Sequence, residues 1–185
     1  MKTQLSHVSS EGGPILIGDS ADLRHWNGSD VALYNQACAS DQFAVTTVEF
    51  GGKNVLSWDF GGAGTAFLVK SDKTEAVFLR FWSNSELSDT VITGLLDIGN
   101  DSIATASLTV TSGRVLVMWA AEDARNIVAP ATGFGRPRRL AIEDAGYFVS
   151  LDAGRYEVKS FHYFKNQIKV AVLRLLRSED QTAEL

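Results

Sequence analysis

The sequence predicts an α+β protein that is mainly β, with antiparallel sheets and one or two helices covering them. Two observations favour this class. Short runs rich in β-branched and aromatic residues recur along the chain, and glycine-containing turn sequences separate them. The composition is 45% hydrophobic and 21% charged, which is ordinary for a globular domain with a substantial apolar core.

The first half of the chain contains five expected strands. The segment PILIG at residues 14–18 is apolar, and Pro14, which has no backbone N–H, suits the first position of a strand. The β-branched run at residues 42–50 ends at Gly51-Gly52. The other three expected strands, of which the last is apolar on both faces, are residues 54–59, 65–70 and 75–82.

The second half repeats this character. The run RVLVMWAA at residues 114–121 is apolar on both sides, so we expect a central strand there. A turn at Asp152-Ala153-Gly154 separates two further strands. The remaining expected strands are residues 102–111, 147–151, 155–163 and 167–176.

Helical signals are fewer. Ser29 or Asp30 can cap a helix in which Val31, Tyr34 and Cys38 share one face, which we expect to be the buried face. Two weaker helical patterns lie at residues 87–95 and 123–128.

We expect a single compact domain at residues 1–177 and a polar tail at 178–185. An internal similarity suggests a division into two related halves, 12–99 and 100–177. GGPILIG from Gly12 resembles SGRVLVMW from Ser112, and AVFLRFW from Ala76 resembles VAVLRLL from Val170. The alternative is coincidence, because short apolar strands resemble one another by default.

Two arginines lie inside apolar strands of this similarity, Arg80 and Arg174. If these strands are buried, both side chains need partners, because an unpaired internal charge is costly. The expected core residues are Ile15, Ile17, Val45, Leu56, Phe67, Phe78, Leu116, Val117, Val149 and Leu173.

Charge and cysteine usage narrow the class of protein. The formal net charge of -5 disfavours nucleic-acid binding, which needs a cationic surface, and favours a basic partner. The single cysteine, Cys38, cannot form an intramolecular disulfide, which fits a cytoplasmic location. The first ten residues lack the apolar region of a secretory signal, and no apolar run approaches the length of a membrane span.

The sequence contains no convincing catalytic motif. It has no G-x-S-x-G segment, and Cys38 has no neighbouring histidine, so an inert thiol is the preferred interpretation. Glu122 and Asp123 follow an apolar strand directly and, with the basic loop around Arg136, would suit a hydrolytic or small-molecule site. Acids in that position also cap helices, so we predict that the protein is not an enzyme.

Metal and cofactor motifs are equally weak. His7, His25 and His162 are dispersed along the chain. Asp19, Asp22 and His25 would converge on a cation only if they lay on one helix, and a solvated polar loop explains them as well. The glycine-rich turns at residues 51–53 and 60–64 lack the spacing of phosphate-binding loops. We therefore predict neither a metal nor a cofactor.

The stretch around Trp26 is the best candidate for a binding surface. Trp26 lies among Asp19, Asp22 and Asp30, and an exposed indole in polar surroundings is typical of an interface hot spot. The alternative is that the indole folds inward and covers the core while the acids stay hydrated.

Three groups of short motifs follow one another along the chain. The first comprises Gly12-Gly13-Pro14, Trp26-x-Gly28, Tyr34 and Ala37-Cys38. The second is the strand Leu79-Arg80-Phe81-Trp82. The third is LDAGRYEV at residues 151–158, which includes Gly154 and Tyr156. In this order, the motifs resemble those of the immunity protein 21 family of bacterial polymorphic-toxin systems.

The resemblance extends from about Gly12 to Leu176. It implies a cytoplasmic protein that binds and neutralises a cognate toxin, with no catalytic residue to transfer. We expect the toxin to be basic, and Asp19, Asp22, Trp26 and Asp30 to bind it. The alternatives are a general β-rich interaction module and a small-molecule-binding protein that uses Glu122, Asp123 and the Arg136 loop.

Overall fold

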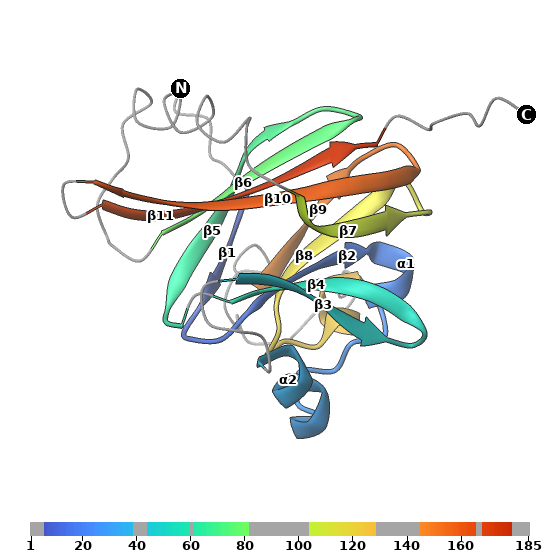
Figure 1. Cartoon of the computed structure of the whole chain (residues 1–185). Coiled ribbons are helices and arrows are strands. Elements are labelled where there is room, and N and C mark those ends of the chain that lie inside the picture. The colour runs from blue at the N-terminus through green and yellow to red at the C-terminus, as the bar shows by residue number, and fades with distance from the viewer. Residues whose placement is uncertain are drawn as a thin grey trace, which may run out of the picture.

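The computed structural model describes residues 6–38, 44–59, 61–81, 104–128, 145–165 and 168–178. Within these residues, two antiparallel sheets pack face to face, and short helices lie against the outer face of one sheet (Figure 1). The predicted class, mainly β with antiparallel sheets and few covering helices, is confirmed. No helix in the described part of the chain is long and apolar enough to cross a membrane.

The larger sheet, sheet A, has six strands in the order β1-β5-β6-β11-β10-β7. All neighbouring strands in it are antiparallel. In this order, the strands are β1 (His7–Ser10), β5 (Gly64–Ser71), β6 (Glu75–Phe81), β11 (Ile168–Arg177), β10 (Gly154–Lys165) and β7 (Ala104–Val110).

The smaller sheet, sheet B, has five strands in the order β3-β4-β2-β8-β9, again all antiparallel. In this order, the strands are β3 (Ala44–Phe50), β4 (Lys53–Asp59), β2 (Ile15–Asp19), β8 (Arg114–Trp119) and β9 (Gly146–Ser150). Each expected strand is present, with small shifts at its ends. Only β1, with the polar sequence HVSS, was not predicted.

The main core lies between the sheets and follows the period of two that strands impose. Ile15 and Ile17 of β2 point into it, whereas Leu16 between them packs on the opposite side, under the helices. All the expected core residues are buried except Phe67, which is half-buried and packs against a third cluster on the outer face of sheet A. Leu116 also belongs to the helix side.

Three short helices accompany sheet B: α1 (Ser20–Leu23), α2 (Val31–Cys38) and α4 (Ala124–Val128). The expected cap forms, because Asp30 Oδ1 accepts hydrogen bonds from the backbone N–H groups of Ala32 and Leu33. The helix α1 was not predicted. The helical pattern expected at residues 87–95 lies outside the described residues.

The expected buried face of α2 is wrong. Val31 is 71% exposed, and Tyr34 and Cys38 are only half-buried. Ala37 is the fully buried residue of this helix, and Leu33 and Tyr34 pack beside it. The helix contacts sheet B through its second half, so its first residue projects beyond the covered surface.

Strands from both parts of the chain contribute to both sheets. The similar segments lie side by side, because β2 pairs with β8 and β6 pairs with β11. Arg80 points between the sheets, on the same face as Phe78, whereas Arg174 lies on the outer face with Val77. The two arginines therefore do not occupy equivalent positions, although both have the partners that burial requires.

Candidate functional site

The expectation that Trp26 is an exposed anchor is wrong. Its side chain is fully buried, and its indole Nε1 donates a hydrogen bond to the carbonyl oxygen of Ala120 at 2.8 Å. Its ring meets that of Phe50 edge to face, with centroids 5.3 Å apart. The inward-folded alternative is the one that forms, because a carbonyl beyond the end of β8 satisfies the indole N–H.

Asp19 is not a surface charge either. Its side chain is 1% exposed and accepts hydrogen bonds from the backbone N–H groups of Ala21, at 2.8 Å, and Ser112, at 2.7 Å. The backbone N–H and hydroxyl of Thr111 also donate to it. Burial by itself would raise the pKa of this carboxyl, but these hydrogen bonds outweigh it and hold the pKa below its ordinary value. Asp19 thus ties β2 to the turn between β7 and β8.

The other two predicted acids remain near the surface. Asp22 is half-buried in the first turn of α1, and Asp30 is exposed at the start of α2. Val31, next to Asp30, is the large hydrophobic residue that stands exposed within the described part of the chain. Of the predicted binding surface, only this beginning of α2 presents charge and apolar area together.

The motif residues near the N-terminus have structural explanations. The carbonyl of Gly12 accepts a hydrogen bond from the indole of Trp119 at 2.7 Å, and the carbonyl of Pro14 accepts one from the N–H of Ala120. Gly13 has φ of 79° and lies against the Tyr34 hydroxyl, so a side chain there would be strained and would clash. These positions shape the β1–β2 connection.

Gly28 has an equally local reason. A Cβ atom at this position would lie 2.2 Å from the carbonyl carbon of Ala121 and 2.3 Å from the carbonyl oxygen of Ala120. The N–H of Gly28 donates to the carbonyl of Glu122 at 3.0 Å, and the N–H of Ala124 donates to the carbonyl of Trp26. The Trp26-x-Gly28 motif therefore holds a loop flat against the segment that follows β8.

The motif near the C-terminus is also structural. Tyr156 is buried, and its hydroxyl lies 2.7 Å from the carbonyl oxygen of Asp152 and 3.1 Å from that of Lys73. It joins the β9–β10 connection to the turn between β5 and β6. Gly154, at φ of 158°, brings the chain beside the guanidinium of Arg177.

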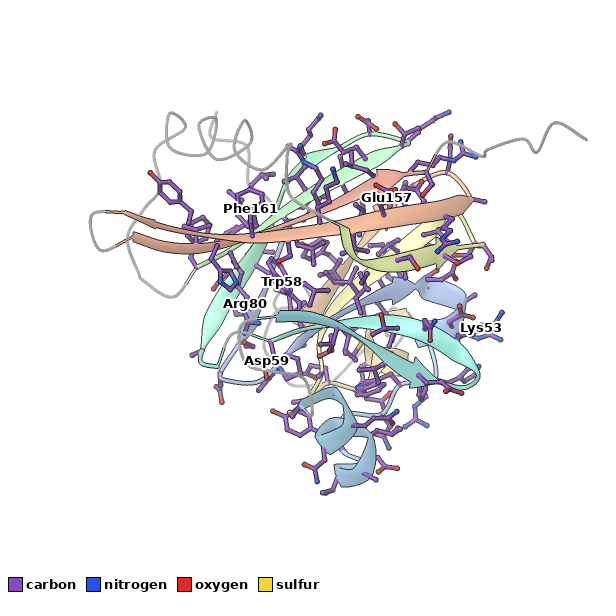
Figure 2. All side chains as sticks on the ribbon, in the orientation of Figure 1. Lys53, Trp58, Asp59, Arg80, Glu157 and Phe161 are labelled. Atoms are coloured by element: carbon purple, nitrogen blue, oxygen red, sulfur yellow. The ribbon has the colours of Figure 1, made fainter. Side chains whose placement is uncertain are left out.

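A polar cluster lies around Arg80, for which the sequence predicted the need for partners but not which residues they are. We call Tyr34, Cys38, Asp59 and Arg80 the Arg80 corner. Arg80 is fully buried, and Figure 2 shows it between the sheets near Trp58 and Asp59. Its only signal in the sequence was an arginine inside an apolar strand.

The guanidinium of Arg80 holds three separate segments. Its Nη1 donates to the carbonyl of Trp58 at 2.7 Å. Its Nη2 contacts the hydroxyl of Ser10 and the carbonyl of Gly13, both at 2.9 Å, and the carbonyl of Gly62 at 3.2 Å. Planar donors in a fixed fork suit this arrangement, so Arg80 locks the β1–β2 and β4–β5 connections together.

Burial and neighbouring charges shift the pKa values of the side chains in the Arg80 corner. Burial lowers the pKa of Arg80 to about 10, and Asp59 opposes that shift, so the guanidinium stays charged at neutral pH. Burial, with a further contribution from Asp59, raises the pKa of the Cys38 thiol, although a hydrogen bond with Tyr34 opposes it. Burial and Cys38 raise the pKa of Tyr34. The raised pKa values keep the thiol and the phenol protonated at neutral pH, and a protonated thiol is a weaker nucleophile than a thiolate.

The other chemical candidates do not come together where the structure describes their residues. Among the described residues, no three His, Cys, Asp or Glu side chains gather as metal ligands would. His25 is exposed and accepts a hydrogen bond from Arg24, whereas Asp19 faces the β7–β8 turn. Asp123 is paired with Arg125 at 2.6 Å, and this pairing lowers its pKa. The Arg136 loop lies outside the described residues.

Comparisons with protein-family models, curated proteins and solved structures found no match to this chain. The resemblance to the immunity protein 21 family stays a prediction based on the order of its short motifs.

Proposed function

We propose that the chain is an immunity protein that binds a cognate toxin domain and neutralises it by covering its surface. The ordered motifs that resemble the immunity protein 21 family support this function. In this structure, the motif residues Gly28, Arg80 and Tyr156 build the scaffold, so the partner-binding residues are to be sought elsewhere on the surface.

The beginning of α2 is the docking surface that we propose, and the exposure of Val31 is the observation that carries it. The Val31 side chain is 71% exposed, and its burial by a partner would stabilise the complex. Asp30 beside it supplies negative charge, and exposed Ala32 extends the apolar area. Protein–protein interfaces commonly have an apolar centre surrounded by a polar rim.

Charge supports the choice of partner. The chain carries a formal net charge of -5. It would therefore attract a basic toxin domain at distances shorter than the Debye length, beyond which salt screens the attraction. Such complementarity accelerates association more than it strengthens the final complex. We therefore expect Asp22→Lys to slow association at low salt and to leave dissociation unchanged.

The binding test uses the purified chain and the purified candidate toxin domain encoded beside its gene. Val31→Arg should weaken the complex at least tenfold, which corresponds to about 1.4 kcal/mol. The matched control is Thr109→Arg on β7, which adds the same charge at an exposed position of the other sheet. Equal affinity of the Val31→Arg and native chains would remove α2 from the interface, whereas no binding by the native chain would overturn the proposed function.

A further inference from the structure

The strand order repeats within the chain. We call residues 7–81 the first unit and residues 104–177 the second unit. The successive strands β1, β2, β4, β5 and β6 of the first unit correspond to β7, β8, β9, β10 and β11 of the second. Sheet A reads β1-β5-β6 from one edge and β7-β10-β11 from the other. Sheet B reads β4-β2 from one side and β9-β8 from the other toward its middle, and β3 has no counterpart among the described residues of the second unit.

The helices follow the same plan. In the first unit, α1 and α2 come directly after β2, and in the second unit α4 comes after β8. All three helices bury residues in the cluster on the outer face of sheet B. The two units therefore correspond both in the pairing of their strands and in the face of sheet B that their helices cover.

The two units meet along the middle of each sheet, at β2–β8 and β6–β11 (Figure 1). Both junctions are antiparallel, which is the arrangement that a two-fold axis perpendicular to the sheets produces. In sheet A the β6–β11 ladder is centred on Phe78 and Leu173, and both side chains enter the core between the sheets.

The similarity between the segments that begin at Gly12 and Ser112 independently locates the same axis. The similarity between the segments that contain Arg80 and Arg174 does not, because it pairs residues 94 apart (170 − 76) and the β6–β11 ladder is centred on residues 95 apart (173 − 78). GGPILIG and SGRVLVM begin at Gly12 and Ser112, so equivalent positions differ by 100 in number (112 − 12). The β2–β8 ladder is centred on the pair Ile17 and Val117, which differ by that offset. Both side chains enter the core between the sheets, as equivalent residues must.

The contacts between the two sheets are also reciprocal between the two units. The edge strand β1 of the first unit lies over β8 and β9 of the second. The edge strand β7 of the second unit lies over β2 and β4 of the first. In an interface between identical subunits, each surface contacts its own counterpart in this reciprocal way.

We infer that the chain consists of two versions of one β-rich unit, fused in tandem, whose junction is an interface of the kind that two identical subunits form. This two-unit origin of the scaffold does not depend on the proposed toxin binding.

A specific protease site within residues 82–103 of the full-length chain tests this inference. After cleavage, the two fragments should stay together, and after separation in denaturant they should reassemble into a one-to-one complex with the native circular-dichroism spectrum. The unfolding midpoint should rise with protein concentration, because the units now associate as separate molecules.

The matched control places the same site in the exposed β3–β4 turn at Gly51-Gly52, inside the first unit. Its fragments separate β1 and β2 from their partners β5 and β4. We expect them to reassociate at least tenfold more weakly than the fragments cut between the units. Equal or tighter reassociation of the control fragments, or failure of the between-unit fragments to reassemble, would overturn the inference. Uncut forms of both variants should unfold like the native chain.

Discussion

Buried polar side chains hold the connections of this protein in place. Asp19 accepts backbone hydrogen bonds from the β7–β8 turn, Arg80 donates to carbonyls of two connections, and Tyr156 joins two turns. Each is buried, and burial of a polar group is tolerated when hydrogen bonds satisfy it. Each is therefore a site where a conservative substitution should reveal a large effect on stability.

Asp19→Asn should destabilise the chain at neutral pH. The substitution removes the charge that strengthens the hydrogen bonds from Ser112, Thr111 and Ala21, and we expect it to cost about 2–3 kcal/mol in the free energy of unfolding. Denaturant unfolding measures this difference. The control is Asp22→Asn in α1, the helix that Asp19 caps, and this substitution of a half-buried side chain should cost less than about 0.5 kcal/mol.

The effect of Asp19 should depend on pH with a definite sign. Its pKa is lower in the folded chain than in the unfolded chain, so the stabilisation is complete above the ordinary aspartate value of about 4. It is lost as the pH falls through the folded-state pKa. The native and Asp19→Asn chains should therefore converge in stability at low pH, and a difference that persists unchanged there would contradict the role of the charge.

Arg80→Met should be among the most destabilising substitutions in the described chain. It leaves the carbonyls of Trp58 and Gly13 without their buried donor, and we expect a loss of about 3–5 kcal/mol. Arg114→Met is the matched control, because Arg114 is exposed and its guanidinium lies over the ring of Phe148. A loss of similar size for both substitutions would show that Arg80 does not lock the corner.

At the scale of elements, strands were predictable because their residues alternate or run apolar between turn sequences. The short strand β1 was not predicted because two of its four residues are serine, and among the described strands it pairs with β5 alone. The burial of Trp26 was not predictable, because its partner carbonyl at Ala120 lies far along the chain. The local composition around Trp26 resembles that of a binding surface. Only tertiary contacts distinguish an exposed indole from one that folds into the core.

Gly28→Ala should disturb the contact between the Trp26 loop and the segment after β8. The new methyl group would lie within 2.5 Å of backbone atoms of Ala120 and Ala121, which cannot move without shifting β8. We expect a loss of about 2–3 kcal/mol in the free energy of unfolding, because overpacking forces the backbone apart. The neighbouring exposed Ser29→Ala should leave stability within about 0.5 kcal/mol of the native value.

At the scale of the whole molecule, the fold class follows from the sequence, whereas the strand order does not. Strands in sheet A come from distant parts of the chain, so pairs such as β6–β11 depend on contacts that local patterns do not encode. The similar segments that begin at Gly12 and Ser112 contain β2 and β8, which are neighbours in sheet B, although the similarity by itself did not predict this pairing. The similarity between Arg80 and Arg174 was misleading, because the two side chains lie on opposite faces of sheet A.

A β-sandwich with an exposed Val31 and a negative net charge is the physical basis of the proposed inhibitor. The most direct test of this account is the growth of bacterial cells that express the neighbouring candidate toxin domain. Coexpression of the native chain should restore growth, and Val31→Arg, expressed at the same soluble level, should restore much less. Failure of the soluble native chain to restore growth would contradict the account.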